Sequence, residues 1–387
     1  MRRALAVLAA ALVTAGLVAA AASASASLKV GIYDEAQTLT APNAEDGFDL
    51  LVELNAQVLR LNLYWDRVAV RRPRFPREPH DPAYDWSFYD RAVQLAAERG
   101  LDLVFSVFAT PAWANGGKGA NYAPAKTKDL ESFAYAAAKR YSGRYVPPAP
   151  GPWSPEGEVL PRVSRWMAWN EPNSPNFLKP QTAKVAGRWV AVSPKTYAGI
   201  CNAVYAGVHA AGKALKVKET VVCGATNPRG NNAYKGARPS ISPLAFLRGM
   251  KEAGAKFDVY AHHPYTPAED LVSPATPPKA RTTVTMGNID TLIAELDRLY
   301  GKGKHVWITE YGYQTNPPDQ AFGVSWATQA AYLTQAFAIA RANPRIDLML
   351  WFLLRDEPDV GRWQSGLMDA EGNRKPSFAA FQALRVQ

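Results

Sequence analysis

Short apolar runs recur along the chain, and each is separated from the next by a stretch with helical periodicity. A run that is apolar on both faces is typical of a strand buried in a parallel sheet, because a strand with one solvated face would alternate. We therefore predict strands at residues 28–33, 56–65, 101–108, 166–171, 217–224, 257–265, 306–310 and 346–354.

The stretches between these runs predict helices. In residues 46–55, Phe48, Leu51 and Leu54 fall on one face, and in residues 85–100 Asp85 is a capping residue and Gly100 a terminator. Similar patterns predict helices at residues 128–141, 194–212, 243–254, 289–300, 326–343 and 377–384.

The alternation of eight strands with eight helices predicts an α/β fold, a single (β/α)8 TIM barrel. An open parallel sheet would normally stop sooner. Such barrels typically need about 250 residues, and this chain is longer, so we expect long loops at the C-terminal face of the barrel.

Residues 1–27 begin with Met1-Arg2-Arg3, continue through an Ala/Leu/Val stretch and end in small residues. This order is typical of a secretory signal peptide, and an uncleaved membrane anchor is the alternative. We therefore predict a secreted, extracellular protein with no membrane association after cleavage. Residues 28–387 are predicted to form one domain.

The formal net charge is +10, or +8 without the two arginines of the predicted signal. The excess is spread along the chain, apart from a cluster at Arg67, Arg71, Arg72, Arg74 and Arg77 that is interleaved with prolines. No nucleic-acid motif accompanies it, so nucleic acid is not an expected partner. The cluster predicts a solvated loop; affinity for anionic or cell-wall glycans is the alternative.

Cys201 and Cys223 are the two cysteines. One falls early in a predicted helix and the other late in the next predicted strand, at similar height in a barrel. Export permits a disulfide, and two buried thiols are the alternative.

Two predicted strands end in a glutamate. Glu171 follows Trp166-Met167-Ala168-Trp169-Asn170, and Glu310 follows Val306-Trp307-Ile308-Thr309. Active sites of such barrels lie at the carboxyl ends of the strands, so the two carboxyl groups should face each other across the mouth. A glutamate pair of this kind is what glycoside hydrolysis requires. The alternative is two ordinary strand-end acids, each paired with a lysine or arginine.

Other polar or aromatic residues at the strand ends should converge on the same cleft: Arg60, Asn62, Asn170, His262, His263, Tyr265 and Trp351. Asn170 and Glu171 are consecutive, so both reach the cleft only if the strand end twists or bulges. Trp113, just beyond the third strand, is either a platform for a sugar face or a packing residue. His262 and His263 should point apart, and no ligand spacing accompanies them, so we expect no metal.

These motifs resemble those of the retaining glycoside hydrolases of clan A, particularly the family 5 and family 39-like secreted bacterial enzymes. The resemblance covers the whole barrel and is carried by Asn170-Glu171-Pro172, by Ile308-Thr309-Glu310-Tyr311-Gly312 and by His263-Pro264-Tyr265, with Arg60 on the second strand and Trp351 on the eighth. The long loops match no subfamily, which leaves the substrate undefined.

The resemblance implies roles for these residues. Glu171 would be the acid/base, Glu310 the nucleophile and Asn170 the group that holds the sugar 2-hydroxyl. Arg60 and Tyr265 would be partners of the nucleophile, His263 a subsite residue and Trp351 the floor under the reacting sugar.

The same roles imply opposite pKa shifts. Arg60 and Tyr265 should lower the pKa of Glu310, whereas a drier setting and the nearby charge should raise that of Glu171. We expect a monomer that acts on a poly- or oligosaccharide and needs no cofactor. A transglycosylase with the same residues and a catalytically silent glycan-binding barrel are the alternatives.

Overall fold

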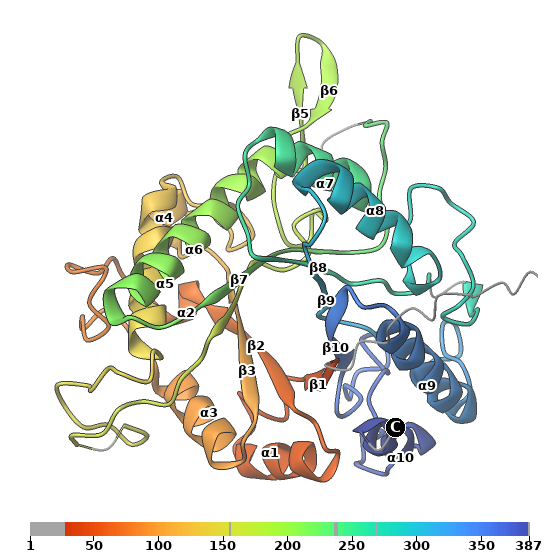
Figure 1. Ribbon diagram of the computed structural model, residues 1–387, viewed down its shortest axis with the longest axis horizontal. Coiled ribbons are helices and arrows are strands. Elements are labelled where there is room, and N and C mark those ends of the chain that lie inside the picture. The colour runs from red at the N-terminus through yellow and green to blue at the C-terminus, as the bar shows by residue number, and fades with distance from the viewer. Residues whose placement is uncertain (1–27, 155, 236–238, 268–269, 386–387) are drawn as a thin grey trace, which may run out of the picture.

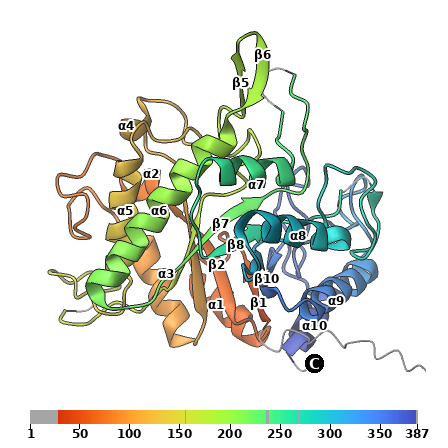
Figure 2. The ribbon, with the colours of Figure 1, turned by 45° about the horizontal axis from the view of Figure 1, so that its top comes forward.

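The computed structural model describes residues 28–385 except 155, 236–238 and 268–269, so the predicted signal peptide lies outside the described residues. Eight parallel strands form a closed barrel in the order β1-β10-β9-β8-β7-β4-β3-β2. Helices surround this barrel in both views (Figures 1 and 2). The predicted (β/α)8 fold is confirmed.

Each barrel strand lies within or close to its predicted range. The barrel strands are β1 (Lys29–Tyr33), β2 (Val58–Tyr64), β3 (Asp102–Phe108), β4 (Arg165–Ala168), β7 (Thr220–Thr226), β8 (Val259–His262), β9 (Val306–Ile308) and β10 (Ile346–Phe352). The helices that follow them in turn are α1 (Ala44–Glu53), α3 (Ser87–Glu98), α5 (Thr127–Arg140), α6 (Ser193–Leu215), α7 (Pro243–Glu252), α8 (Ile289–Tyr300), α9 (Trp326–Ala342) and α10 (Pro376–Gln382).

The strands are apolar on both faces because each face meets a different core. Inward residues form a small cluster inside the barrel, and outward residues join the larger cluster beneath the helices. On β10, Leu348 and Leu350 belong to the inner cluster, whereas Met349 and Trp351 belong to the outer one. Side chains of a strand alternate between faces, so this assignment fixes the direction of each residue near the mouth.

Several short elements in the loops were not predicted. They are α2 (Trp65–Val68), α4 (Ala112–Asn115), the 3-10 helix η2 (Met286–Asn288), and the antiparallel hairpin of β5 (Thr182–Val185) and β6 (Arg188–Ala191). The 3-10 helix η3 (Ala383–Arg385) instead continues α10, largely within the helix predicted at residues 377–384. The hairpin projects away from the barrel in both views (Figures 1 and 2). These elements lack the length or the period by which a sequence reveals a helix or strand.

Cys201 of α6 and Cys223 of β7 form a disulfide, which decides between the two predicted alternatives. Both residues are fully buried. The bond ties a long outer helix to the strand that follows it, closing a loop of 22 residues.

The ends of the described chain lie at the same end of the barrel. Lys29 begins β1 at the amino end of the barrel. The last helix, α10, returns to this end and contacts the end of α1, where the Gln382 amide donates to the Glu53 carbonyl at 2.9 Å and Asn55 Nδ2 donates to the Gln382 carbonyl at 3.2 Å. Both ends are therefore remote from the carboxyl-terminal mouth.

The cationic cluster begins with Arg67 in α2 and continues into the loop after it, and its arginines are solvent-exposed, as predicted. Its arginines nevertheless lie over aromatic rings. The guanidinium carbon of Arg67 is 4.0 Å from the Tyr64 ring centroid, and that of Arg77 is 3.7 Å from the Tyr135 ring centroid. Cation–π contacts therefore order this loop. Among the described residues, no helix combines the length and hydropathy needed to span a bilayer.

Candidate active site

Glu171 lies three residues beyond the end of β4. The strand ends earlier than predicted because Trp169 has a φ of 69°, which breaks the extended backbone, and Glu171 has a φ of 36°. Its backbone N–H donates to the Ala225 carbonyl at 3.0 Å. This double bend allows the consecutive Asn170 and Glu171 side chains to reach the same site, as the sequence required.

Glu310 lies two residues beyond β9 and is held by two donors, Arg60 on β2 and Tyr265 in the segment after β8. Arg60 Nη1 donates to Glu310 Oε1 at 2.7 Å, and the Tyr265 hydroxyl donates to Oε2 at 3.3 Å. The other guanidinium nitrogen, Nη2, donates to Asn170 Oδ1 at 2.6 Å. The structure thus brings together four of the predicted residues: Arg60, Asn170, Tyr265 and Glu310.

His263 lies between the two acids. Its Nδ1 is 3.1 Å from Glu171 Oε1 and 3.5 Å from Glu310 Oε2, while Nε2 accepts from the Thr309 hydroxyl at 2.9 Å. Burial and the charge of Arg60 lower the pKa of His263 well below its usual value, so the ring is neutral. These partners place its proton on Nδ1.

This arrangement corrects the subsite role that the resemblance implied for His263. The side chain is fully buried, so it holds the two carboxyl groups rather than lining a subsite. The neighbouring His262 points away from His263, as predicted, with Nδ1 2.8 Å from the Thr226 hydroxyl and Nε2 3.1 Å from the Val284 carbonyl oxygen. It is fully buried and does not line the cleft, so the prediction that it converges there is wrong.

The two acids form a close pair, with one carboxylate oxygen of each within 4.8 Å of the other. Burial and then the charge of Glu310 raise the pKa of Glu171 well above its usual value, although Arg60 and an Asn227 hydrogen bond oppose this. Burial also raises the pKa of Glu310, against the opposing effects of Arg60 and Tyr265.

The prediction that the pKa of Glu310 is lowered is therefore wrong, because the loss of solvent outweighs one guanidinium and one phenol. The predicted order of the two pKa values, with that of Glu171 the higher, remains. Glu310 has the direct Arg60 contact and Glu171 does not, so Glu310 is the first of the pair to ionise.

Glu171, His263 and Glu310 each offer an atom that is able to bind a metal, and these atoms lie within 4.8 Å of one another. The Arg60 guanidinium already neutralises Glu310 at 2.7 Å, and His263 Nδ1 carries the proton that faces Glu171. A second cation would have to displace that proton and lie beside a fixed positive charge. The donor set therefore fits a shared proton better than a metal ion.

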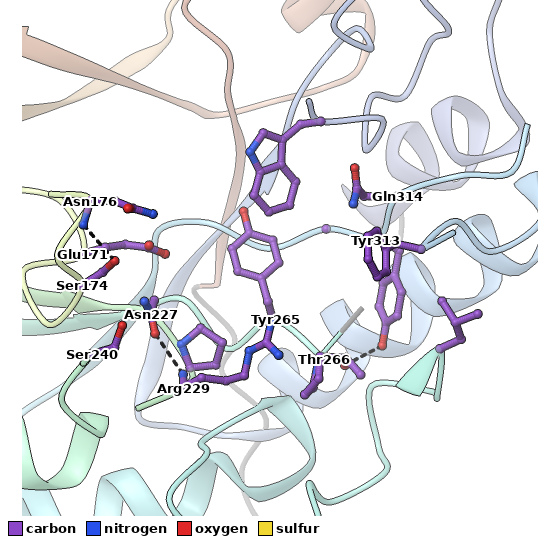
Figure 3. Close-up of a pocket in the computed structure, with 16 residues that line it drawn as sticks. Glu171, Ser174, Asn176, Asn227, Arg229, Ser240, Tyr265, Thr266, Tyr313 and Gln314 are labelled. Atoms are coloured by element: carbon purple, nitrogen blue, oxygen red, sulfur yellow. Dashed lines mark hydrogen bonds between the residues drawn. The ribbon is translucent and has the colours of Figure 1, made fainter. Parts of the chain in front are cut away.

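A cavity of about 360 Å³ opens beside Glu171 and Tyr265. Figure 3 shows both side chains directed into it, with Asn227 and Arg229 on one side and Tyr313 and Gln314 on the other. Its wall is mixed, with amide, hydroxyl and guanidinium groups next to exposed apolar rings. Such a lining suits a ligand with both hydroxyls and apolar faces.

Trp351 is not the floor of this cavity. It is fully buried in the outer core, and its Nε1 donates to the Ser365 carbonyl at 2.8 Å. Because Leu348 and Leu350 point into the barrel, the alternation along β10 turns Trp351 outward and Phe352 toward the mouth.

The indole at the mouth belongs instead to Trp363, in the loop between β10 and α10. Trp363 is 42% exposed and lines the cavity. Its ring centroid lies 5.6 Å from that of Tyr265 and 5.3 Å from that of Phe352. Sequence reasoning missed it, since a tryptophan in a long loop has no strand register to indicate its direction.

Trp113 is a packing residue rather than an open platform. Its Nε1 donates to the Ala69 carbonyl at 2.7 Å, and the Arg72 guanidinium carbon lies 4.5 Å from its ring centroid. Trp65 packs edge-on against the ring at 5.5 Å. With its polar atom satisfied and its ring packed against Arg72 and Trp65, Trp113 does not line the cavity beside Glu171.

A family model described as a family of unknown function (DUF5722) matches residues 229–387, from the loop after β7 to the end of the chain. No curated protein matches the sequence.

Solved structures match over almost the whole chain. A family 39 glycoside hydrolase from the gut symbiont Bacteroides cellulosilyticus WH2 is 18% identical with a TM-score of 0.63 over 94% of this chain, which spans 64% of the length of that protein. GH5_18 from Streptomyces cattleya in complex with GlcNAc is 13% identical with a TM-score of 0.62, over 94% of this chain and 80% of that one.

Xylanase 10B from Thermotoga maritima is 14% identical with a TM-score of 0.56, and the match covers 92% of this chain and 94% of that one. At such identities the likeness concerns the fold. The chain therefore has the barrel fold of these enzymes.

Proposed function

We propose that the protein is a secreted, monomeric retaining glycoside hydrolase that cleaves O-glycosidic bonds of a poly- or oligosaccharide. The observation that carries the proposal is the close carboxyl pair, with oxygens of Glu171 and Glu310 within 4.8 Å. In retaining enzymes the carboxyl groups are about 5–5.5 Å apart, whereas inverting enzymes need about 6.5–9.5 Å to admit a water. The barrel fold shared with glycoside hydrolases supports the same conclusion.

In the first step the Glu310 carboxylate attacks the anomeric carbon, and the bond from this carbon to the leaving oxygen breaks. Glu171 gives its proton to that oxygen, so the leaving group departs as an alcohol. The pKa order supports these roles, since the acid with the Arg60 contact ionises first and the other keeps its proton.

In the second step Glu171, now ionised, takes a proton from water, and the resulting hydroxide displaces Glu310 from the anomeric carbon. Two inversions return the original anomeric configuration. Arg60 and Tyr265 stabilise the departing Glu310 carboxylate through the bonds they already make. His263 keeps the two carboxyl groups in place throughout.

The cavity beside Glu171 is on the side of the acid, where the leaving group must lie, so it is suited to the leaving sugar. The composition of residues 1–27, which is typical of a secretory signal peptide, supports the proposal that the protein is exported. A transglycosylase would use the same residues with a sugar hydroxyl in place of water, and it would be recognised by products longer than the substrate.

Azide rescue tests the assignment of the two acids. With an aryl β-glycoside whose leaving group needs little protonation, Glu171→Ala should form the glycosyl-enzyme and then stall. Added azide should restore turnover and give a glycosyl azide with the anomeric configuration of the substrate. Product configuration is read by NMR.

Rescue of Glu310→Ala should instead give the inverted azide, because the anion then replaces the nucleophile. An inverted azide from Glu171→Ala would exchange the two assignments. Absence of hydrolysis by the unaltered protein across aryl glycosides and polysaccharides would favour the silent glycan-binding barrel.

A further inference from the structure

A second cavity, of about 630 Å³, opens at the ends of β1, β2 and β10. It lies on the opposite side of the Phe352–Trp363 ring pair from the cavity beside Glu171, since Phe352 lines one cavity and Trp363 the other. Its volume is within the range of about 300–1,000 Å³ found for small-molecule sites.

Tyr33 connects this cavity to the acid pair. Its ring lines the cavity, and the Arg60 guanidinium carbon lies 4.3 Å from its centroid. Arg60 in turn donates to Glu310. The Tyr33 and Arg60 side chains therefore link the second cavity to Glu310, on the side away from the leaving-group cavity.

Glu35 is a carboxylate in this cavity that the proposed mechanism does not use. Its Oε1 accepts from the Asn62 backbone N–H at 2.5 Å, and its Oε2 accepts from the Tyr64 hydroxyl at 2.8 Å. A carboxylate has about four acceptor sites, so Glu35 retains acceptor capacity for a ligand. The two bonds fix its orientation before any ligand arrives.

The charges around the cavity give no preference for an anion. Asp356 is neutralised by the buried Lys375 at 2.7 Å, and Glu357 lies 3.6 Å from Arg362. The remaining lining groups are the carboxyls of Asp34, Glu35 and Asp359 and the guanidinium groups of Arg67 and Arg355. Positive charge is not in excess, and a carboxylate ligand would meet Glu35.

The lining also contains the rings of Tyr33, Tyr64 and Phe352. Ring faces, a carboxylate acceptor and arginine donors together match a sugar, whose apolar faces alternate with hydroxyls that both donate and accept. We propose that this cavity is the glycone-side subsite and that Glu35 selects a neutral sugar residue there by accepting its hydroxyl hydrogens. The inference rests on the proposed glycosidase function.

The test compares the full-length protein with Glu35→Gln and with the control Glu252→Gln, an exposed glutamate at the end of α7. The probes are p-nitrophenyl β-glycosides of neutral disaccharides in gluco, manno and xylo configuration, and the matching uronate glycosides. We expect the neutral probes to be preferred. Glu35→Gln should lower kcat/KM on the best one by roughly ten- to a hundredfold, with Glu252→Gln unchanged.

Thermal unfolding checks that Glu35→Gln is folded, and Tyr64→Phe, which removes one of the bonds that orient Glu35, should give a smaller loss. A kcat/KM within twofold of the unaltered protein for a folded Glu35→Gln overturns the subsite while leaving hydrolysis intact. Faster hydrolysis of the uronate probes overturns the preference for a neutral sugar.

If the unaltered protein hydrolyses no probe, the proposed function fails separately. The subsite is then decided by calorimetry with neutral gluco-, manno- and xylo-trisaccharides. If the unaltered protein binds a trisaccharide and Glu35→Gln weakens that binding tenfold or more, the subsite is supported. Equal affinities of the two proteins, or no binding to the unaltered protein, overturn the subsite.

Discussion

The two ends of the barrel each contain a carboxyl group beside an arginine, and the pKa values of these two groups are shifted in opposite directions. At the amino end, Asp102 pairs with Lys29 and with Arg165 at 3.1 Å, and its side chain is 40% exposed. Burial raises its pKa, but the hydrogen bonds and charges of the two cations more than reverse this, so the pKa is below its usual range.

At the mouth, Glu310 has an equally direct contact, with Arg60 at 2.7 Å, yet its pKa is raised. The difference is water. Half-exposed Asp102 keeps part of its solvation, and two cations outweigh the part that it loses. Glu310 loses most of its solvation, and one guanidinium does not replace it. The ion pairs at the amino end therefore favour the charged form of Asp102, whereas burial at the mouth shifts the pKa of both acids toward the neutral form.

The largest test of this contrast is activity. Glu310→Gln should lower kcat on an aryl β-glycoside by roughly 10⁴-fold or more, because no covalent intermediate forms. Asp102→Asn should retain kcat within about twofold, because Asp102 is at the opposite end of the barrel from the acids. A loss below a hundredfold in folded Glu310→Gln would mean that another group is the nucleophile.

The next largest effects distinguish Trp351, whose indole is buried in the barrel wall, from Trp363, whose indole lies at the mouth. Trp351→Ala should lower the free energy of unfolding by about 3–5 kcal/mol, because it empties a fully buried site. Trp363→Ala should leave stability nearly unchanged and raise KM for an oligosaccharide several-fold. Denaturant titration measures the stability of both variants, and steady-state kinetics measures their KM. A stable Trp351→Ala with a raised KM, together with a destabilised Trp363→Ala, would restore Trp351 as the sugar platform.

The smallest expected effect is on stability, whose dependence on pH should have opposite sign at the two ends of the barrel. Because the folded pKa of Glu171 is raised, Glu171 ionises more readily in the unfolded chain, and the fold loses stability as pH rises above about 4.3. Glu171→Gln should therefore melt on the order of a few degrees higher than the unaltered protein at pH 8, and the difference should close near pH 4.

Asp102, whose folded pKa is lowered, contributes stability above about pH 3.9 that is lost as pH falls. Because the site is half-exposed, Asp102→Asn should cost at most about 1 kcal/mol at pH 7. Melting curves between pH 3 and 8 check both variants. Shifts of the same sign would remove the contrast between the two ends.

The barrel was predictable because its strands and helices differ in period and repeat eight times, so errors at single boundaries did not alter the count. Both acids were predictable for the same reason: each follows a buried strand of the barrel. The position of Trp351 was also readable in principle, since the alternation of Leu348, Leu350 and Phe352 on β10 turns it outward.

Other features have no signature in the sequence. Trp169 and Glu171 adopt positive φ values that only tertiary contacts impose on non-glycine residues, at a cost of roughly 1–3 kcal/mol each. Trp363 and Glu35 reach their cavities from loops without a period. The raised pKa of Glu310 depends on how deeply the folded chain removes it from water, which no residue type encodes.

The return of α10 to α1 has a practical consequence. Both ends of the described chain lie at the amino end of the barrel, where the Gln382–Glu53 contact holds the last helix. A support or fusion partner attached through either end would leave the mouth facing outward, toward a large insoluble substrate. Immobilised protein should therefore retain access to polymers that attachment near the β5–β6 hairpin would obstruct.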